Sequence, residues 1–298
     1  MTKKLSVGGQ AVIEGVMMRG PGKIAVAVRK GDGTIAVDLD GVGTLGDKYP
    51  LLKKPLIRGV VSLGESLYYG MKALSYSAQV SGDEEETMDS KDMALTIGAS
   101  VLLAVGLFIV IPTWTMRFLH NYTTNALVLN LAEGLLRLSI FLTYIWGISQ
   151  MPDIQRVFQY HGAEHKTIYT YEHNLPLEVA NVRPFSTLHP RCGTNFLMIV
   201  MLISTFVFAF LGWPSLPLRI LSRIVLMPFI AGISYEIIRY AGKHMEKKWV
   251  QKAIWPGLCL QKLTTRQPDD SQIEVAIASL KAVLPPEELE KLPESKAC

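Results

Sequence analysis

Four apolar stretches alternate with charged segments along the chain: residues 93–112, 126–147, 195–213 and 216–238. Each has about the 20 residues that an α-helix needs to cross the hydrocarbon core of a bilayer. Aromatic residues stand close to the ends of these stretches, as they do at membrane interfaces: Trp114, Trp146, Trp213 and Tyr240. The pattern predicts an α-helical membrane protein with four transmembrane helices.

Lysine and arginine are distributed unevenly around these stretches. Residues 1–92 and 239–298 are rich in them and the loop 148–194 carries four, whereas the connection after the first stretch has only Arg117. Because positively charged loops stay on the cytoplasmic side, both termini and the loop 148–194 are predicted to be cytoplasmic. The N-terminus MTKKLSVGGQ lacks the apolar core of a signal peptide, so the first helix is expected to direct insertion into the plasma membrane.

The first 92 residues show two different periodicities. Residues 1–50 form a Gly-rich β region, in which 23–29 and 34–38 alternate apolar and polar positions around Gly31-Asp32-Gly33 and predict a β-hairpin. Residues 51–78 repeat apolar positions at helical spacing but carry charges, so we expect an amphipathic helix at the interface or against the bundle. An acidic linker, 82–92, follows it.

The last segment, 239–298, is expected to be a cytoplasmic helical region. Ser271 and Glu274 have the spacing of a capping box, and the apolar positions that follow predict a helix. The pair Pro285-Pro286 would end this helix.

Composition removes some classes of function. Hydrophobic residues make up 49% of the chain, and the net charge of +4 is spread without a basic stripe of interleaved aromatics, so nucleic acid is not an expected partner. Three widely spaced cysteines do not make a disulfide framework and fit a reducing compartment. The expected partners are the lipid bilayer and an unidentified substrate or protein.

The cytoplasmic loop 148–194 contains the main candidate for chemistry. Pro152 stands near its start, where proline suits the first turn of a helix. This helix is expected to run to about residue 174. Within it His161, Glu164 and His165 share one helix face. Two imidazoles one turn apart can bind a divalent metal, and a neighbouring glutamate can act on water as a catalytic base. The alternative is a solvated helix face.

A metal site needs further ligands, and the same loop supplies them. His189 and Cys192 have a spacing that suits a metal and precede the third apolar stretch, so they could fold back onto the helix of His161. Nitrogen and sulfur donors of this kind favour Zn²⁺. If all four residues bound the metal, the site would be closed and structural; with three, a position would stay open for water. Further candidate ligands are Glu172, His173 and Glu236.

Other ionisable residues stand out by their surroundings. Glu133 and Arg137 lie inside the second apolar stretch at the spacing of a helical ion pair, which is either functional or a structural pair facing the bundle. In the Gly-rich stretch 8–21, Glu14 and Arg19 are the ionisable residues, and Glu14 is a candidate catalytic group.

Six segments together resemble the YqhQ-like family of bacterial multi-pass membrane proteins: GGQAVIEGVMMRGP (8–21), RGVVSLGESLYYGMKAL (58–74), YHGAEHKTIYTYE (160–172), HPRCGTNF (189–196), SYEIIRYAGKH (234–244) and PGLCLQKLTTRQPDDSQIEVAI (256–277). The resemblance covers nearly the whole chain. It implies a metal-dependent membrane protein, with no particular reaction and no assigned residue roles.

Three functions are compatible with these features. The first is a metal-dependent membrane enzyme, a hydrolase by its His-x-x-Glu-His motif. The second is a non-catalytic scaffold whose metal ties the loop to the bundle. The third is a transporter with Glu133 and Arg137 on its path, which four helices without an inverted repeat make the weakest of the three.

Overall fold

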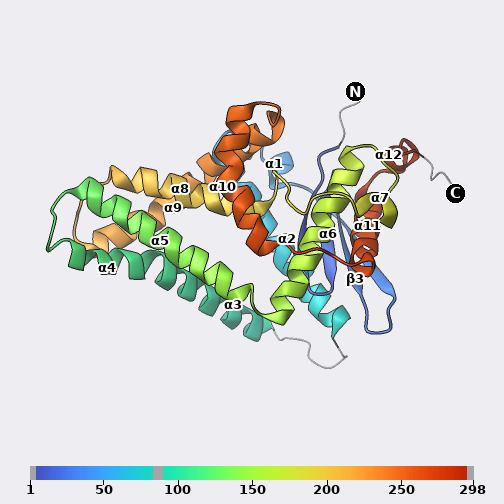
Figure 1. Ribbon diagram of the computed structural model, residues 1–298, viewed down its shortest axis with the longest axis horizontal. Coiled ribbons are helices and arrows are strands. Elements are labelled where there is room, and N and C mark those ends of the chain that lie inside the picture. The colour runs from blue at the N-terminus through green and yellow to red at the C-terminus, as the bar shows by residue number, and fades with distance from the viewer. Residues whose placement is uncertain (1–4, 83–89, 294–298) are drawn as a thin grey trace.

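The structure is a computed structural model that describes residues 5–82 and 90–293. It has two parts, an elongated bundle of apolar helices and, at one end of it, a small sheet covered by helices (Figure 1). The chain begins in the sheet part and enters the bundle. It returns to the sheet with residues 152–182, passes through the bundle again and comes back to the sheet near its C-terminal end. The acidic residues 83–89 of the predicted linker lie outside the described residues.

The N-terminal part forms a four-stranded antiparallel sheet in the order β1-β2-β3-β4. The strands are β1 (Gly8–Val12), β2 (Gly15–Gly20), β3 (Lys23–Arg29) and β4 (Ile35–Gly41). The predicted hairpin is confirmed as β3 and β4, which pair from Arg29 opposite Ile35, with Gly33 at a positive φ of 84° in the turn. Strands β1 and β2 add a second hairpin that the sequence pattern did not predict.

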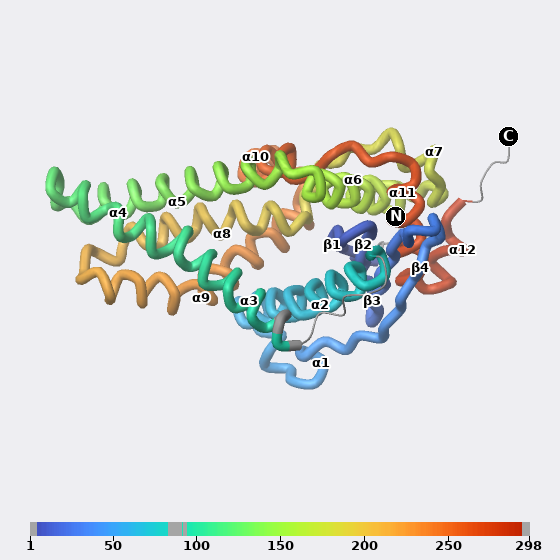
Figure 2. Tube along the Cα trace, turned by 90° about the horizontal axis from the view of Figure 1, so that it is seen from below, coloured from blue at the N-terminus to red at the C-terminus, as the bar shows by residue number. Residues whose placement is uncertain are grey.

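Helices cover both faces of the sheet. The helix α2 (Ile57–Ser81) packs on one face, where Met17 and Val26 join a core with Ala73. Helices α6 (Pro152–Glu172) and α11 (Asp270–Val283) cover the other face, against Val16 and Met18. Figure 2 shows α2 on one side of the strands and α6 on the other. The predicted amphipathic helix is therefore a packing helix between the sheet and the bundle.

Three helices of the bundle are long and apolar enough to cross a membrane: Ala94–Leu119, Ala126–Ile148 and Leu216–Lys243. The first consists of α3 (Ser90–Val105), a π-helical turn η2 (Gly106–Val110) and α4 (Ile111–Leu119). The other two are α5 (Ala126–Ile148) and α9 (Leu216–Lys243). They confirm the predicted stretches 93–112, 126–147 and 216–238 as long apolar helices.

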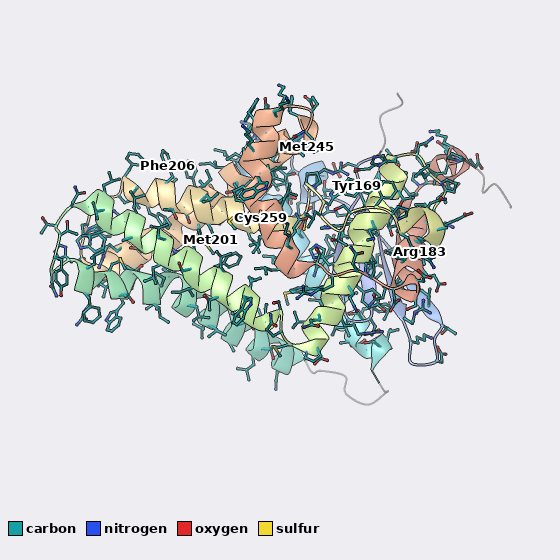
Figure 3. The ribbon with its side chains drawn as sticks, in the orientation of Figure 1. Tyr169, Arg183, Met201, Phe206, Met245 and Cys259 are labelled. Carbon is teal, nitrogen blue, oxygen red and sulfur yellow. The ribbon has the colours of Figure 1, made fainter. Side chains whose placement is uncertain are left out.

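The fourth predicted stretch, 195–213, forms a shorter apolar helix, α8 (Gly193–Ala209). It packs between α5 and α9, and exposed apolar side chains such as Phe206 point away from the bundle (Figure 3). The helix ends four residues before Trp213 because the following turn contains Gly212 at a positive φ of 69°. Its 17 residues give a length of about 26 Å at the rise of an α-helix.

The C-terminal segment is helical, with α10 (Lys248–Thr264), α11 and α12 (Pro286–Glu290). The predicted cap of α11 was wrong by two residues: Asp269 caps the helix and shares a capping box with Gln272. Ser271 hydrogen-bonds Asp269, and Glu274 pairs with Arg29 of β3, so tertiary contacts use both residues of the predicted box. Short elements complete the chain: α1 (Leu45–Lys48), η1 (Pro50–Lys53) and α7 (Val179–Val182).

Candidate metal centre

The helix α6 follows the predicted bounds and carries the His-x-x-Glu-His motif on a buried face. Glycine at position 162 lets this helix approach the segment after α10. A Cβ on Gly162 would stand 2.1 Å from the carbonyl oxygen of Arg266, far inside contact distance. The backbone of this segment therefore passes directly against the His-x-x-Glu-His motif.

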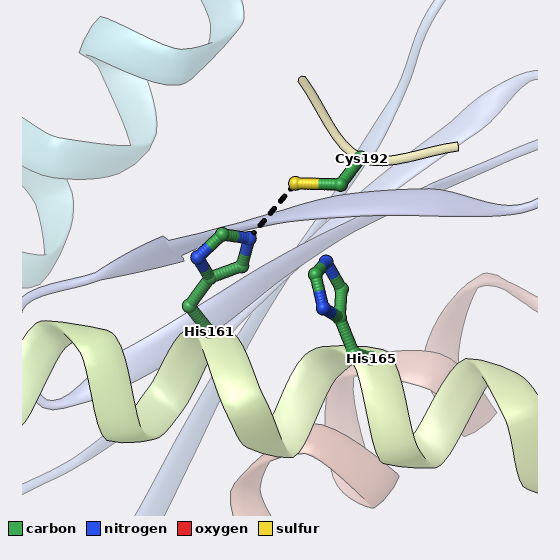
Figure 4. Close-up of side chains that lie close together, drawn as sticks. All are labelled: His161, His165 and Cys192. Atoms are coloured by element: carbon green, nitrogen blue, oxygen red, sulfur yellow. Dashed lines mark hydrogen bonds between the residues drawn. The ribbon is translucent and has the colours of Figure 1, made fainter. Parts of the chain in front are cut away.

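Three predicted ligands come together on this face (Figure 4). One ligand atom each of His161, His165 and Cys192 lies within 4.8 Å of the other two. Nε2 of His161 is 3.1 Å from Sγ of Cys192. Donor atoms bound at the usual ~2.0–2.3 Å to one Zn²⁺ are separated by distances of this size, so the arrangement fits a single ion.

Backbone carbonyls orient both imidazole rings. Nδ1 of His161 donates to the carbonyl oxygen of Thr264 at 2.8 Å, and Nδ1 of His165 donates to that of Thr187. Since a carbonyl can only accept, each Nδ1 carries the proton and each Nε2 keeps its lone pair, the arrangement usual for metal-bound histidine. Nε2 of His165 is buried and has no hydrogen-bond partner within the described chain.

Cys192 stands at the N-cap of α8, where it receives electrostatic support. The Thr194 backbone N–H donates to Sγ of Cys192 at 3.3 Å. The positive end of the helix dipole favours a negative sulfur at this place. Gln261 of α10 fixes the approach to this cap, because its side-chain amide both donates to and accepts from the backbone of His189 at 2.8 Å.

Glu164 is buried beside the three ligands. Its Oε2 lies 4.0 Å from Nε2 of His161. Burial raises the pKa of the Glu164 carboxyl, while the charges of His161 and His189 and the Gly9 backbone N–H oppose that rise. Gly9 can come this close because it has no side chain. A Cβ there would lie 2.6 Å from the carbonyl oxygen of Met17 and 3.0 Å from Cγ of Glu164. Strand β1 therefore forms one wall of the site.

His189 lies next to the group but is turned away from it. Its ring centre is 5.6 Å from that of His165, its Nε2 faces Glu172 at 3.4 Å, and its Nδ1 accepts the Arg191 backbone N–H at 3.3 Å. Burial lowers the pKa of His189 to about 4. The sequence left open a site with three ligands and one with four. The structure brings His161, His165 and Cys192 together and leaves the side chain of His189 outside this group.

The other candidates are engaged elsewhere. Glu236 forms an ion pair with Arg58 of α2, and Glu172 one with Arg191. Nδ1 of His173 bonds the carbonyl oxygen of Tyr169 at the end of α6. Neither Glu236 nor His173 belongs to the group around Cys192 that the described residues form.

Two ionisable residues of the Gly-rich stretch tie the sheet to helices. Glu14, at a positive φ of 50° in the turn between β1 and β2, pairs with Arg156 and accepts a hydrogen bond from Tyr160. Arg19 pairs with Glu65 of α2. Glu14 thus docks the β1–β2 hairpin onto α6, with its carboxylate held by residues that precede His161.

Inside the bundle, Glu133 and Arg137 form the predicted ion pair at 2.6 Å. Both side chains are almost fully buried among packed residues, and Arg223 of α9 joins Glu133 at 3.1 Å. These surroundings are those of a packed polar network in the bundle.

Comparisons with known proteins place the chain among relatives. Residues 54–286 match the family described as "Protein of unknown function (DUF1385)". The chain belongs to the DUF1385 family. It is similar to "Uncharacterized protein YqhQ" of Bacillus subtilis (strain 168), with 37% identity over 93% of this chain and 92% of that protein. No solved structure matches the chain.

The match to the DUF1385 family includes α6 and Cys192 but not the sheet, so it does not cover Gly9. Sequence reasoning missed Gly9, Gln261 and the two carbonyls that orient the histidines. Gly162 was the available signal, since glycine inside a helix often marks the close approach of another backbone. The carbonyls gave no signal because any residue type provides one.

Proposed function

We propose that this protein is a metal-dependent enzyme of the membrane, of the hydrolase type, in which His161, His165 and Cys192 hold one divalent cation. The observation that carries the proposal is the buried Nε2 of His165, which has no hydrogen-bond partner among the described residues and lies beside two further donor atoms. A buried nitrogen lone pair without a partner is costly unless a donor or a cation faces it. Two imidazoles and one sulfur favour Zn²⁺ among the common divalent cations.

The chemistry of the proposal rests on three ligands and a carboxylate. A cation held by three protein ligands keeps a position for water or substrate, and it lowers the pKa of water and polarises a carbonyl or phosphoryl oxygen. Glu164 would accept a proton from a water molecule held at the cation, and the burial that raises the pKa of its carboxyl makes it a stronger base for that role. The side chain of His161 is 15% exposed and that of Glu164 is 6% exposed, so a substrate would approach the cation from the side of His161.

The proposed setting is the cytoplasmic face of the plasma membrane. Four transmembrane helices, with α8 as the shortest, would place both termini, α6 and the first turn of α8 on the side where lysine and arginine are concentrated. Seventeen residues lie at the lower limit of the lengths that cross a bilayer. Glu14 serves in this proposal as the anchor of the β1–β2 hairpin.

A second candidate function is a scaffold with a structural metal. The observation that favours it is the burial of His165, Glu164 and Cys192, which leaves little of the site open to solvent. In this case the cation would tie α6 to α8, and Glu164 would support a ligand.

The two functions differ in whether a small ligand can reach the cation. The purified protein is loaded with Co²⁺ and titrated with acetohydroxamate, a bidentate ligand for open metal positions. The enzyme predicts a change in the cobalt absorption spectrum, and the scaffold predicts none. In Glu164→Gln, cobalt should stay bound while the pH dependence of the spectrum shifts; Glu172→Gln on the same helix is the matched control and should leave it unchanged.

A further inference from the structure

Three buried arginines gather around one carboxylate near the end of the bundle that is remote from the sheet. Glu133 binds Arg137 at 2.6 Å and Arg223 at 3.1 and 3.2 Å, and it accepts a hydrogen bond from Thr113 at 3.2 Å. Arg223 also donates to Asn130 at 2.7 Å. Both oxygens of Glu133 thus accept hydrogen bonds from these partners.

Arg219, one turn before Arg223 on α9, is the third arginine. It is 3% exposed, and its Nε and Nη1 have no hydrogen-bond partner among the described residues. Its guanidinium carbon lies 3.7 Å from the centre of the Trp213 ring. The His120 ring stacks on the same tryptophan, with the two ring centres 5.8 Å apart. Aromatic contact covers one side of the guanidinium and supplies no acceptor for its N–H groups.

The charges of this region do not balance. Glu133 is the one acidic residue of the sequence in 94–148 and 193–235, so a single negative charge faces the positive charges of Arg137, Arg219 and Arg223. Arginine cannot lose its proton in a protein. A buried charge requires a partner, and this holds more strongly inside a bilayer than in water.

The position of Arg219 indicates what the partner is. It is the fourth residue of α9, about 5 Å along the helix from its first residue, where the helix dipole also favours an anion. Trp213 is placed as an interfacial tryptophan would be. This is the depth of lipid phosphates, and the fork of a guanidinium suits two oxygens of a phosphate.

We propose that Arg219, supported by Arg223, binds a phosphate-type anion, either the headgroup of a phospholipid or free inorganic phosphate. This binding site is separated from the metal centre by the length of α8, about 26 Å. It therefore does not depend on the function proposed for the metal centre.

The test uses the full chain, delipidated in a non-ionic detergent and offered dioleoyl phosphatidylglycerol, diacylglycerol or inorganic phosphate. Native mass spectrometry measures retention, and thermal unfolding measures stabilisation. Wild type should retain about one phospholipid or one phosphate per chain, and Arg219→Gln should weaken that binding at least about tenfold, the usual effect of losing a charge-assisted hydrogen bond. Arg117→Gln is the control, since Arg117 is exposed and rests on Trp114 near the same end of the bundle.

Each result decides the question. If wild type retains phosphatidylglycerol but not inorganic phosphate, the ligand is a phospholipid headgroup. If it retains inorganic phosphate, the site accepts the free anion. Equal retention by wild type and Arg219→Gln, equal retention of diacylglycerol, or none at all overturns the proposal. If Arg219→Gln does not fold, Arg219→Lys replaces it, because lysine keeps the charge and loses the fork; its binding should be weakened while its stability without ligand stays that of wild type.

Discussion

Nε2 of His161 lies 3.1 Å from Sγ of Cys192, although the two residues are 31 positions apart. The first belongs to α6, which packs on the sheet, and the second caps α8, which packs inside the apolar bundle. Their contact therefore joins the two parts of the molecule. A cation between them would connect the metal centre to the first turn of a bundle helix.

The close packing at Gly162, beside the candidate metal centre, predicts the effect of adding one methyl group. In Gly162→Ala the new Cβ would collide with the Arg266 carbonyl oxygen, so we expect a loss of about 1–3 kcal/mol in the free energy of unfolding, together with weaker metal binding. Gly64→Ala is the control, because nothing lies within 4 Å of that position and α2 should tolerate alanine. Denaturant titration measures the free energy of unfolding of both variants. Equal stability of Gly162→Ala and Gly64→Ala would contradict the close packing at Gly162.

The contact of Glu14 with Arg156 predicts an anchoring effect. Because the two side chains are 24% and 48% exposed, Glu14→Gln should cost no more than about 1 kcal/mol of stability, the upper range for a surface pair. Metal content should be that of wild type, since Glu14 is not in the group of ligands. Elemental analysis and thermal unfolding check this, and loss of the metal would show that Glu14 belongs to the centre.

The buried His189 predicts a pH dependence of stability in the metal-free protein. Its folded pKa of about 4 lies below the ordinary value of 6.5, so between these values the unfolded chain binds more protons than the folded one. Its contribution is complete above about pH 6.5 and is lost as the pH falls towards 4, amounting to roughly 3 kcal/mol at most.

The His189→Asn variant tests this dependence, because its amide oxygen can still accept the Arg191 N–H. Chemical unfolding at a series of pH values should show a weaker loss of stability in acid for this variant than for wild type. His244→Asn, at the end of α9, should retain the dependence of wild type. Identical acid profiles for wild type and His189→Asn would exclude His189 as the source.

The buried polar network inside the helix bundle predicts a large structural effect. Glu133→Gln removes the carboxylate that Arg137 and Arg223 share, and breaking a buried pair costs about 3–5 kcal/mol. Ser139→Ala on the exposed side of α5 should change stability little. Unfolding in detergent micelles measures the difference, and a stable, fully folded Glu133→Gln protein would argue for a transport role over a structural one.

Much of the local structure could be predicted from the sequence. Helix α6 has proline at its start and a motif whose spacing already places His161 and His165 on one face. The β3–β4 hairpin has a polar alternation in β4 and a glycine turn. Strand β2 could not be recognised in this way, because Val16, Met17 and Met18 are all buried and the strand shows no alternation.

The choice among candidate ligands depended on tertiary contacts. Cys192 and His189 were equivalent by spacing, but Glu172 and the Arg191 backbone hold the His189 ring while Cys192 turns into the group. The same limit applied to Glu236, whose partner Arg58 is 178 positions away. Contacts at such separation leave no local pattern in a single sequence.

The metal content of the purified full chain tests the central claim most directly. After zinc loading and dialysis, wild type and His173→Ala should each hold about one zinc ion per chain, because His173 bonds a carbonyl outside the group. His165→Ala should lose most of the metal, since it removes the buried nitrogen that has no other partner in the described chain. A wild-type protein without stoichiometric metal, or a His165→Ala variant that holds as much as wild type, would contradict the metal centre.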